Sequence, residues 1–385
     1  MMFAAGSERA VRFANAHLSA KCARRWGARI LGGLLLLGGM GCRERVEAPG
    51  SVVMIIESSP NNLDLRQGTD AQSERVGGLV FDALVKKDEH FNLQPWLATR
   101  WEQPDNLTWV IHLRDGVRFQ DGRALGAEDV AYTIRSMIDG TLITAKGGAF
   151  AAVKDVEVVD RLTVRVQLKR PDAGLLFNMS DGLFGVVPRG AGRDFGLHPV
   201  GSGPFRFVSA VQDKEVVLER NSGYWADELS GDKQPRGGGH PTPSDGTGKG
   251  GAPGLLTGHR IERIRFEVVP DTITAALELK KGSADLASNV VTLDMIHTLE
   301  QEPNLKVESA PSSVVVYANF NVNEPVLKDK RVRQAVACAM DRQAIVDAIW
   351  RGQARLAETL LPAAHWAAYG PRTSDWSTNS ASRWR

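Results

Sequence analysis

Two periods of apolar spacing run through the chain and predict a mixture of strands and helices. The run Val52–Ile56 predicts a buried first strand, and alternation over Leu107–Leu113 predicts a half-buried one. Helical spacing over Gly126–Ile138, with Gly140 just beyond, predicts a helix and its stop. We expect another short helix over Leu79–Val85. Strands and helices alternate, so the expected class is α/β, mixed with α+β.

The second half of the sequence has clearer helix boundaries. Asp271 precedes the helical pattern Thr272–Lys281, and Gly282 follows it, as expected of a cap and a stop. Asp329 and Asp341 begin two further helices, the last with Ile345, Val346, Ile349 and Trp350 facing inward. Further strands are expected over Val153–Val159, Thr163–Leu168, Val216–Glu219, Ile261–Val269, Ala284–Leu286 and Val314–Phe320.

The N-terminal region has the pattern of an export signal. A basic cluster over Lys21–Arg29 precedes the uncharged run Ile30–Gly41, which is too short to cross ~30 Å of hydrocarbon as a helix. The Gly41–Cys42 junction resembles the lipobox of bacterial lipoproteins, in which the Cys receives the lipid. Residues 1–42 are therefore expected to be a signal peptide, with Cys42 as the lipid attachment point. A plain cleaved signal and an uncleaved anchor remain alternatives.

Composition and charge exclude several classes. Net charge is +2, and that argues against a dedicated nucleic-acid binder. Cys338 is the single Cys beyond the leader, so no disulfide framework is expected in the folded part. We find no catalytic constellation, no metal-ligand spacing among the His residues and no cofactor motif, and expect no enzyme. Residues 230–258 hold almost no apolar side chain and predict a mobile loop or insertion.

Four blocks in order resemble the extracytoplasmic solute-binding proteins of peptide/nickel ABC importers, family 5, which include the oligopeptide- and dipeptide-binding proteins. The resemblance covers roughly residues 51–362. The blocks are Leu93–Gly122 continuing into Ala127–Val130, then Pro199–Phe205, then Arg220–Trp225, and finally Asp329–Arg342.

This resemblance implies a two-lobed clamshell of the periplasmic-binding-protein type, with an extra subdomain in the first lobe. Ligand would be enclosed between the lobes by hinge closure. We expect the first lobe over residues 43–258, its subdomain over about 98–168, the hinge crossing over 259–271 and a partial second lobe over 272–385. The family continues past Pro362, so we expect an incomplete second lobe and a truncation at the C-terminus.

The implied function is that of the substrate-binding component of an ABC importer. It would capture oligopeptides or dipeptides and deliver them to permease subunits with their ATPase. We expect a monomer in the periplasm or on the outer face of the cytoplasmic membrane, with the lipid on Cys42 as its anchor. A nickel complex, heme or an oligosaccharide are alternative ligands in the same scaffold. A sensor or chaperone-like module, a hydrolase and a non-functional truncated product are alternative functions.

Two groups of polar and aromatic residues are candidates for the ligand site. The first follows the first strand and lies just before a helix. The second ends a strand of the second lobe, where open α/β sheets bind ligands. Ordinary surface or core positions are the alternative for each. The candidates are Asp70, Gln72 and Ser73 in the first group, and Tyr317, Asn319, Phe320 and Asn323 in the second.

Overall fold

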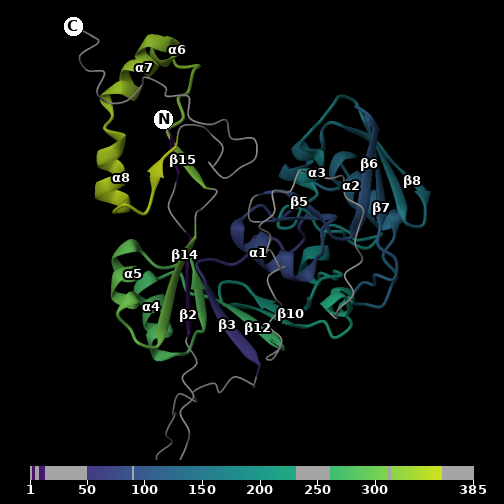
Figure 1. The fold of residues 1–385 in the computed structure, drawn as a ribbon, viewed down its shortest axis with the longest axis horizontal. Helices are drawn as coiled ribbons and strands as arrows, with labels where there is room; N and C mark the ends of the chain where they lie inside the picture. Colours follow the sequence, from purple (N-terminus) through teal and green to yellow (C-terminus); the bar gives the residue numbers. More distant parts are fainter. Residues whose placement is uncertain are drawn as a thin grey trace, which may run out of the picture.

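A computed structural model describes residues 2–4, 8–13, 50–88, 91–230, 261–310 and 314–357. Within them the protein forms two large sheets, which pack against three hydrophobic cores, and a smaller unit near the C-terminus (Figure 1). The fold is mixed α/β, as the sequence predicts.

A seven-stranded sheet forms the centre of the first lobe. Its strand β3, Ser51–Ile56, lies parallel to its two neighbours β12 and β13. Met54 and Ile56 pack into one hydrophobic core, and Val53 and Ile55 into another on the opposite face. Burial on both faces explains why this strand is a continuous apolar run. The sheet order is β10 (Phe205–Val211), β11 (Glu215–Arg220), β12 (Arg263–Val268), β3, β13 (Leu286–Ser288), β2 (Glu8–Phe13) and β14 (Leu305–Ala310).

The polypeptide leaves this sheet later than we expected. β12, β13 and β14 all belong to the sheet of β3, so strands on both sides of the expected hinge crossing at 259–271 and second-lobe start at 272 share one sheet. β12 and β13 pair with the two edges of β3, and the side chains of β3 are buried in the cores on the two faces of the sheet. Helices α4 (Thr272–Lys281) and α5 (Leu293–Glu300) also belong to this lobe, since Ala275, Ala276, Leu279 and Leu299 share a core with β3.

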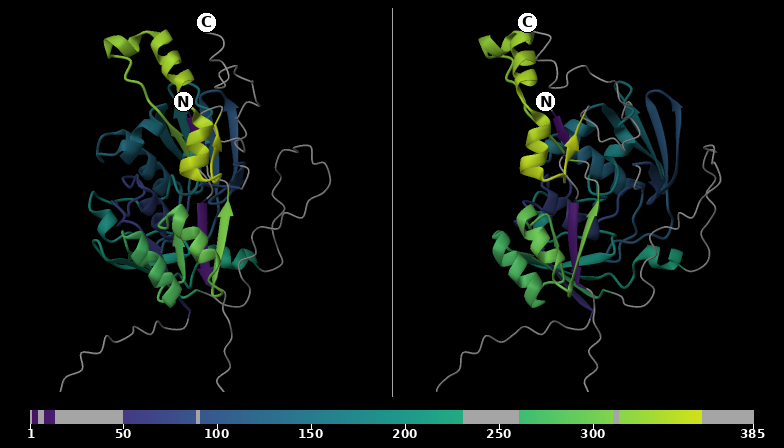
Figure 2. Two further views of the ribbon diagram at one scale, coloured as in Figure 1. Left: turned by 90° about the vertical axis from the view of Figure 1, so that its left-hand side faces the viewer. Right: turned by 60° about the vertical axis from the view of Figure 1, so that its left-hand side comes forward.

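Residues 314–357 form a separate unit beyond β14 (Figure 2). Asp329 and Asp341 cap its two longer helices through their side chains, as predicted. Val346 is buried, but Ile349 is 63% exposed, so the expected inward face of the last helix is wrong at that position. The elements are β15 (Val315–Tyr317), α6 (Pro325–Lys328), α7 (Lys330–Ala339), α8 (Arg342–Trp350) and β16 (Arg355–Leu356).

Two strands come from the predicted leader. β2 pairs antiparallel with both β13 and β14, and β1 (Met2–Ala4) pairs with β15 and β16. Cys42 and most of the predicted signal lie outside the described residues, as does the stretch 231–260. Export and lipid attachment stay predictions. In the described part of the protein, no helix is long and apolar enough to span a bilayer.

A four-stranded antiparallel sheet forms a subdomain beside the first lobe (Figure 1). Its order is β6 (Ala98–Asp105), β7 (Thr108–Leu113), β9 (Thr163–Leu168) and β8 (Val153–Asp160), and helix α2 (Ala127–Ile138) packs on it. The core under α2 also takes in Ala83–Val85 before the sheet and Leu175–Val186 after it. Smaller elements are β4 (Val85–Lys87), β5 (Leu93–Pro95), α3 (Leu175–Asn178), η1 (Ala145–Phe150), η2 (Phe195–Leu197) and η3 (Trp225–Ser230).

Helix α1 lies upstream of where we expected it. It spans Ala71–Val80, whereas residues 81–84 are not helical. A Cβ built on Gly77 would come within 2.5 Å of Leu65 Cδ2, so this glycine allows the loop to pack against the helix. We expected the helix to begin at Leu79, after Gly77 and Gly78, but both glycines lie within it.

Candidate functional site

Asp70 holds the start of α1 and the loop that follows β3. Its carboxylate accepts the backbone N–H groups of Gln72 and Ser73 at 3.1 and 3.0 Å, and that of Asn61 at 3.1 Å. Burial pushes the pKa of Asp70 up, but hydrogen bonds from Ser73 and the backbone hold it below its ordinary value. Asp70 is thus a helix cap. The hydroxyl of Ser73, which is fully buried, accepts the backbone N–H of Asn62 at 3.2 Å and so holds the loop against the helix.

Gln72 connects the ends of two neighbouring strands. It is buried, at 2% exposure, and its Nε2 donates to Glu57 Oε2 at 2.7 Å. Its Oε1 accepts from Arg75 Nη1 at 2.6 Å, and Arg75 Nη2 lies 3.4 Å from Ser288 Oγ. Glu57 follows β3 directly, and Ser288 ends β13. The three candidates Asp70, Gln72 and Ser73 therefore sit in the cap and first turn of α1, not before a helix.

Glu57, Arg75 and Ser288 are site residues that sequence reasoning missed. Glu57 is the first polar residue after the buried strand, which is a local signal. Arg75 and Ser288 are 213 positions apart, so only the fold brings them together.

The second group of candidates lies on the C-terminal unit. Tyr317 ends β15 and is 56% exposed, and Asn319 and Asn323 are also exposed. Phe320 is half-buried. The described contacts do not join this group to the first one, so the structure does not unite the two sets.

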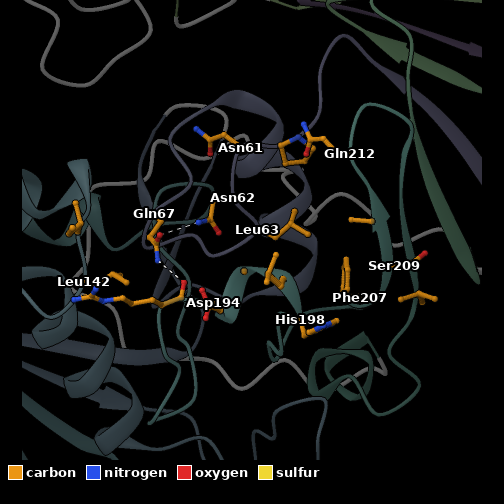
Figure 3. Close-up of a pocket in the computed structure, with 17 residues that line it drawn as sticks. Asn61, Asn62, Leu63, Gln67, Leu142, Asp194, His198, Phe207, Ser209 and Gln212 are labelled. Atoms are coloured by element: carbon orange, nitrogen blue, oxygen red, sulfur yellow. Dashed lines mark hydrogen bonds between the residues drawn. The ribbon is translucent and has the colours of Figure 1, made fainter.

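A cavity of about 710 Å³ opens beside the loop that Asp70 holds (Figure 3). This volume falls within the usual range for small-ligand pockets. Asn62 Nδ2 donates to Gln67 Oε1 at 3.1 Å, and Gln67 Nε2 donates to the Arg193 carbonyl at 3.3 Å across the wall (Figure 3). The lining is mixed, with Asn61, Asn62, Gln67, Asp194, His198 and Gln212 as polar members and Leu63, Leu142, Phe207 and Val208 as apolar ones.

A buried ion pair braces this wall from behind. Arg66 and Asp64 are almost fully buried and lie 2.6 Å apart. Arg66 Nη2 also donates to the Ala191 carbonyl at 3.1 Å, and its guanidinium lies 5.8 Å from the Phe195 ring centroid. The pair thus ties the loop after β3 to the loop before η2, and both loops line the cavity. Among the described residues, no cluster of three His, Cys, Asp or Glu side chains could hold a metal ion.

The family model of bacterial extracellular solute-binding proteins, family 5 (middle), matches residues 92–381. The chain belongs to this family. The match extends past Pro362, where we expected the resemblance to fade.

The family 5 chain is similar to proteins named glutathione-binding protein GsiB. It is 27% identical to the one from Pectobacterium atrosepticum over 322 residues, which is 82% of this chain and 57% of the relative. With the one from Escherichia coli O157:H7 it shares 24% identity over 320 residues. The chain spans 57–60% of the length of the curated relatives it matches.

Solved structures share the fold of the family 5 chain. The oligopeptide-binding protein AppA from Bacillus subtilis, in complex with a nonapeptide, matches with a TM-score of 0.68 at 24% identity, over 84% of this chain and 60% of that one. DppA from Helicobacter pylori, in complex with the peptide STSA, matches with a TM-score of 0.67 at 21% identity, over 87% and 65%. These neighbours are two-lobed periplasmic binding proteins, so the fold is of that type.

Proposed function

We propose that this protein is the extracytoplasmic solute-binding component of an ABC importer and that it captures a small peptide. The family match over residues 92–381 carries the proposal. Its support in the structure is the polar edge formed by the carboxyl ends of β3 and β13, where open α/β sheets bind ligands.

Glutathione and related short peptides are the first ligands to test. The curated relatives are named for glutathione, and two solved neighbours were determined with peptides. Oligopeptides and dipeptides belong to the same proposed class. The cavity beside the Asp70 loop is large enough for a few residues of such a ligand.

Place and partners follow from the proposal. A protein that hands its ligand to a permease with an associated ATPase works outside the cytoplasm, in the periplasm or on the outer face of the cytoplasmic membrane. Attachment through a lipid on Cys42 would keep it close to the permease, and the protein would act as a monomer.

A thermal melt with candidate ligands tests the proposal. The purified full-length protein is heated alone, with glutathione and with a pool of di- to pentapeptides. A ligand at 100 times its dissociation constant adds about 2.7 kcal/mol to the free energy of unfolding. We expect an upward shift with glutathione or with the pool. A cooperative melt that none of these peptides moves would contradict a peptide ligand.

A further inference from the structure

Two opposite charges at the polar edge are held apart by a neutral amide. The Glu57 carboxylate and the Arg75 guanidinium each contact Gln72, at 2.7 and 2.6 Å, and neither pairs with the other. A carboxylate only accepts and a guanidinium only donates, so the amide of Gln72 has a single orientation that satisfies both. Gln72 is buried in the first turn of α1, which fixes the spacing of the two charges.

Within the described part of the chain, Arg75 lacks the carboxylate partner that the largely buried side chains of Arg66 and Arg220 have. Arg66 and Arg220 each have a carboxylate oxygen within 2.6 Å. Among the described residues, no carboxylate lies within ion-pair distance of Arg75, and Glu57 likewise has no cationic partner there. Both side chains are half-buried, where an unpaired charge is costly. An ionic ligand would supply the missing partners.

Both groups have hydrogen-bonding capacity to spare. A guanidinium has five N–H donors, and Arg75 uses one in a short bond to Gln72 and another in a long contact of 3.4 Å to Ser288. A carboxylate accepts about four bonds, and that of Glu57 accepts one from Gln72. Glu57 follows β3, and Ser288, which Arg75 contacts, ends β13, so both charged groups lie at the carboxyl edge of the sheet. The carboxyl end of β14 lies on the same edge, and β14 leads on to residues 314–357 (Figure 1).

We propose that Glu57 binds the α-ammonium and Arg75 the α-carboxylate of a ligand that carries both groups on one carbon. Gln72 is the positioning residue that sets their spacing. Free amino acids have this pair of groups, and so do peptides that begin with a γ-linked glutamyl residue. An ordinary α-linked peptide carries its ammonium and its carboxylate at opposite ends, and can satisfy only one of the two side chains at a time.

This inference rests on the proposed function and names its substrate class. Its test compares two isomeric tripeptides, γ-Glu-Cys-Gly and α-Glu-Cys-Gly, by titration calorimetry on the full-length protein. The isomers have the same composition and net charge, and differ in whether the first residue keeps its α-carboxylate. We expect the γ isomer to bind at least about tenfold more tightly, since a hydrogen bond to a charged group has about that effect.

Two variants test whether Glu57 and Arg75 cause the preference for the γ isomer. Arg75→Gln and Glu57→Gln keep the approximate size of each side chain and remove one charge. Each is expected to weaken binding of the γ isomer by about 10- to 100-fold and to reduce the preference over the α isomer. Arg100→Gln is the matched control, because Arg100 lies on the subdomain sheet with 61% of its side chain exposed, and this variant should bind like the parent protein. Cooperative melting of each variant shows that it has folded.

The outcomes separate the inference from the proposed function. If both isomers bind equally, or if both charge variants discriminate like the parent protein, the inference fails while a peptide-binding function stands. If no peptide binds the parent protein at all, both fail. Free glutamate distinguishes the two ligand sources: binding as tight as that of the γ isomer would identify a free amino acid as sufficient, and weaker binding would identify the γ-linked peptide.

Discussion

The indole Nε1 of Trp225 donates a 2.9 Å hydrogen bond to the carboxylate of Asp82, a residue 143 positions earlier in the sequence. Asp82 is 3% exposed. The same carboxylate accepts from Trp96 Nε1 at 2.8 Å, Ser202 Oγ at 2.9 Å and Tyr224 OH at 3.1 Å. Three of the blocks that carry the family resemblance thus meet at one acidic side chain, and this contact explains why those blocks contain Trp, Ser and Tyr.

Replacing Asp82 by Asn should destabilise the protein strongly. Each carboxylate oxygen accepts from one indole N–H and one hydroxyl, so the amide NH₂ would face an indole N–H, which cannot accept, whichever way it turned. Leaving buried donors without an acceptor costs about 1–3 kcal/mol for each group, and we expect a loss of about 3 kcal/mol or more. Urea unfolding measures the loss. Asp105→Asn, at an exposed position, is the control and should change stability by less than about 0.5 kcal/mol.

Tyr224 should resist ionisation in the folded protein. Burial raises the pKa of its phenol, and the nearby Asp82 carboxylate raises it further. A group whose folded pKa is raised stabilises the fold below its unfolded pKa, which is about 10, and this stability falls as the pH climbs above that value. We therefore expect Tyr224→Phe to flatten the loss of stability in alkali, measured by urea unfolding between neutral pH and the alkaline range. An unchanged alkaline slope would contradict this account.

Gly201 should tolerate no side chain. A Cβ built there would lie 1.9 Å from the carbonyl oxygen of Val80, and a backbone atom in this position cannot rotate away. We expect Gly201→Ala to cost about 3 kcal/mol or to prevent folding, at or beyond the upper end for overpacking. Gly148→Ala is the control, since nothing lies within 4 Å of its added Cβ. A melt of Gly201→Ala that matches that of the parent protein would refute the close approach.

Acid should loosen the start of α1. The folded pKa of Asp70 lies below its ordinary value of 3.8, so its contribution is complete above that value and is lost as the pH falls through the lowered pKa. Asp70→Asn keeps a capping oxygen without a titrating charge, and its stability should depend less on pH below about pH 4. Chemical unfolding at several acid pH values tests this expectation. A parallel decline in both proteins would assign the acid sensitivity to other carboxylates.

Removal of the predicted leader should expose β14. Among the described strands, β14 pairs only with β2, which lies in residues 8–13. A protein that begins at Cys42 lacks β2, so amides of Leu305–Ala310 should exchange with solvent faster than in the full-length protein. Hydrogen exchange followed by mass spectrometry compares the two. Equal protection would mean that another segment replaces β2 in the shorter form.

The sequence predicts local features well. The helix Thr272–Lys281 has the expected bounds, because Asp271 accepts the Thr274 N–H and Gly282 adopts a left-handed conformation. Strands β8 and β9 and helix α2 also follow the patterns predicted for them. In each case the signal lies within a few residues of the element that it defines.

Contacts between distant parts of the protein are what the sequence could not supply. Glycine has a low helix propensity, yet Gly77 lies within α1, where a Cβ would clash with the side chain of Leu65. Gln72 was a candidate because it is polar, while its partners Glu57 and Arg75 gave no pattern that could pair them. The family resemblance identified its blocks without showing that three of them converge on Asp82.

The core beneath α2 sets a limit on recombining this protein with its relatives. Residues 98–168 look like a self-contained cassette, but their hydrophobic core is completed by Ala83–Val85 and Leu175–Val186. An exchange of the four strands and α2 alone would join two half-cores from different parents, whose side chains were never selected to interlock. Chimeras cut outside residues 83 and 186 would carry the whole core with them.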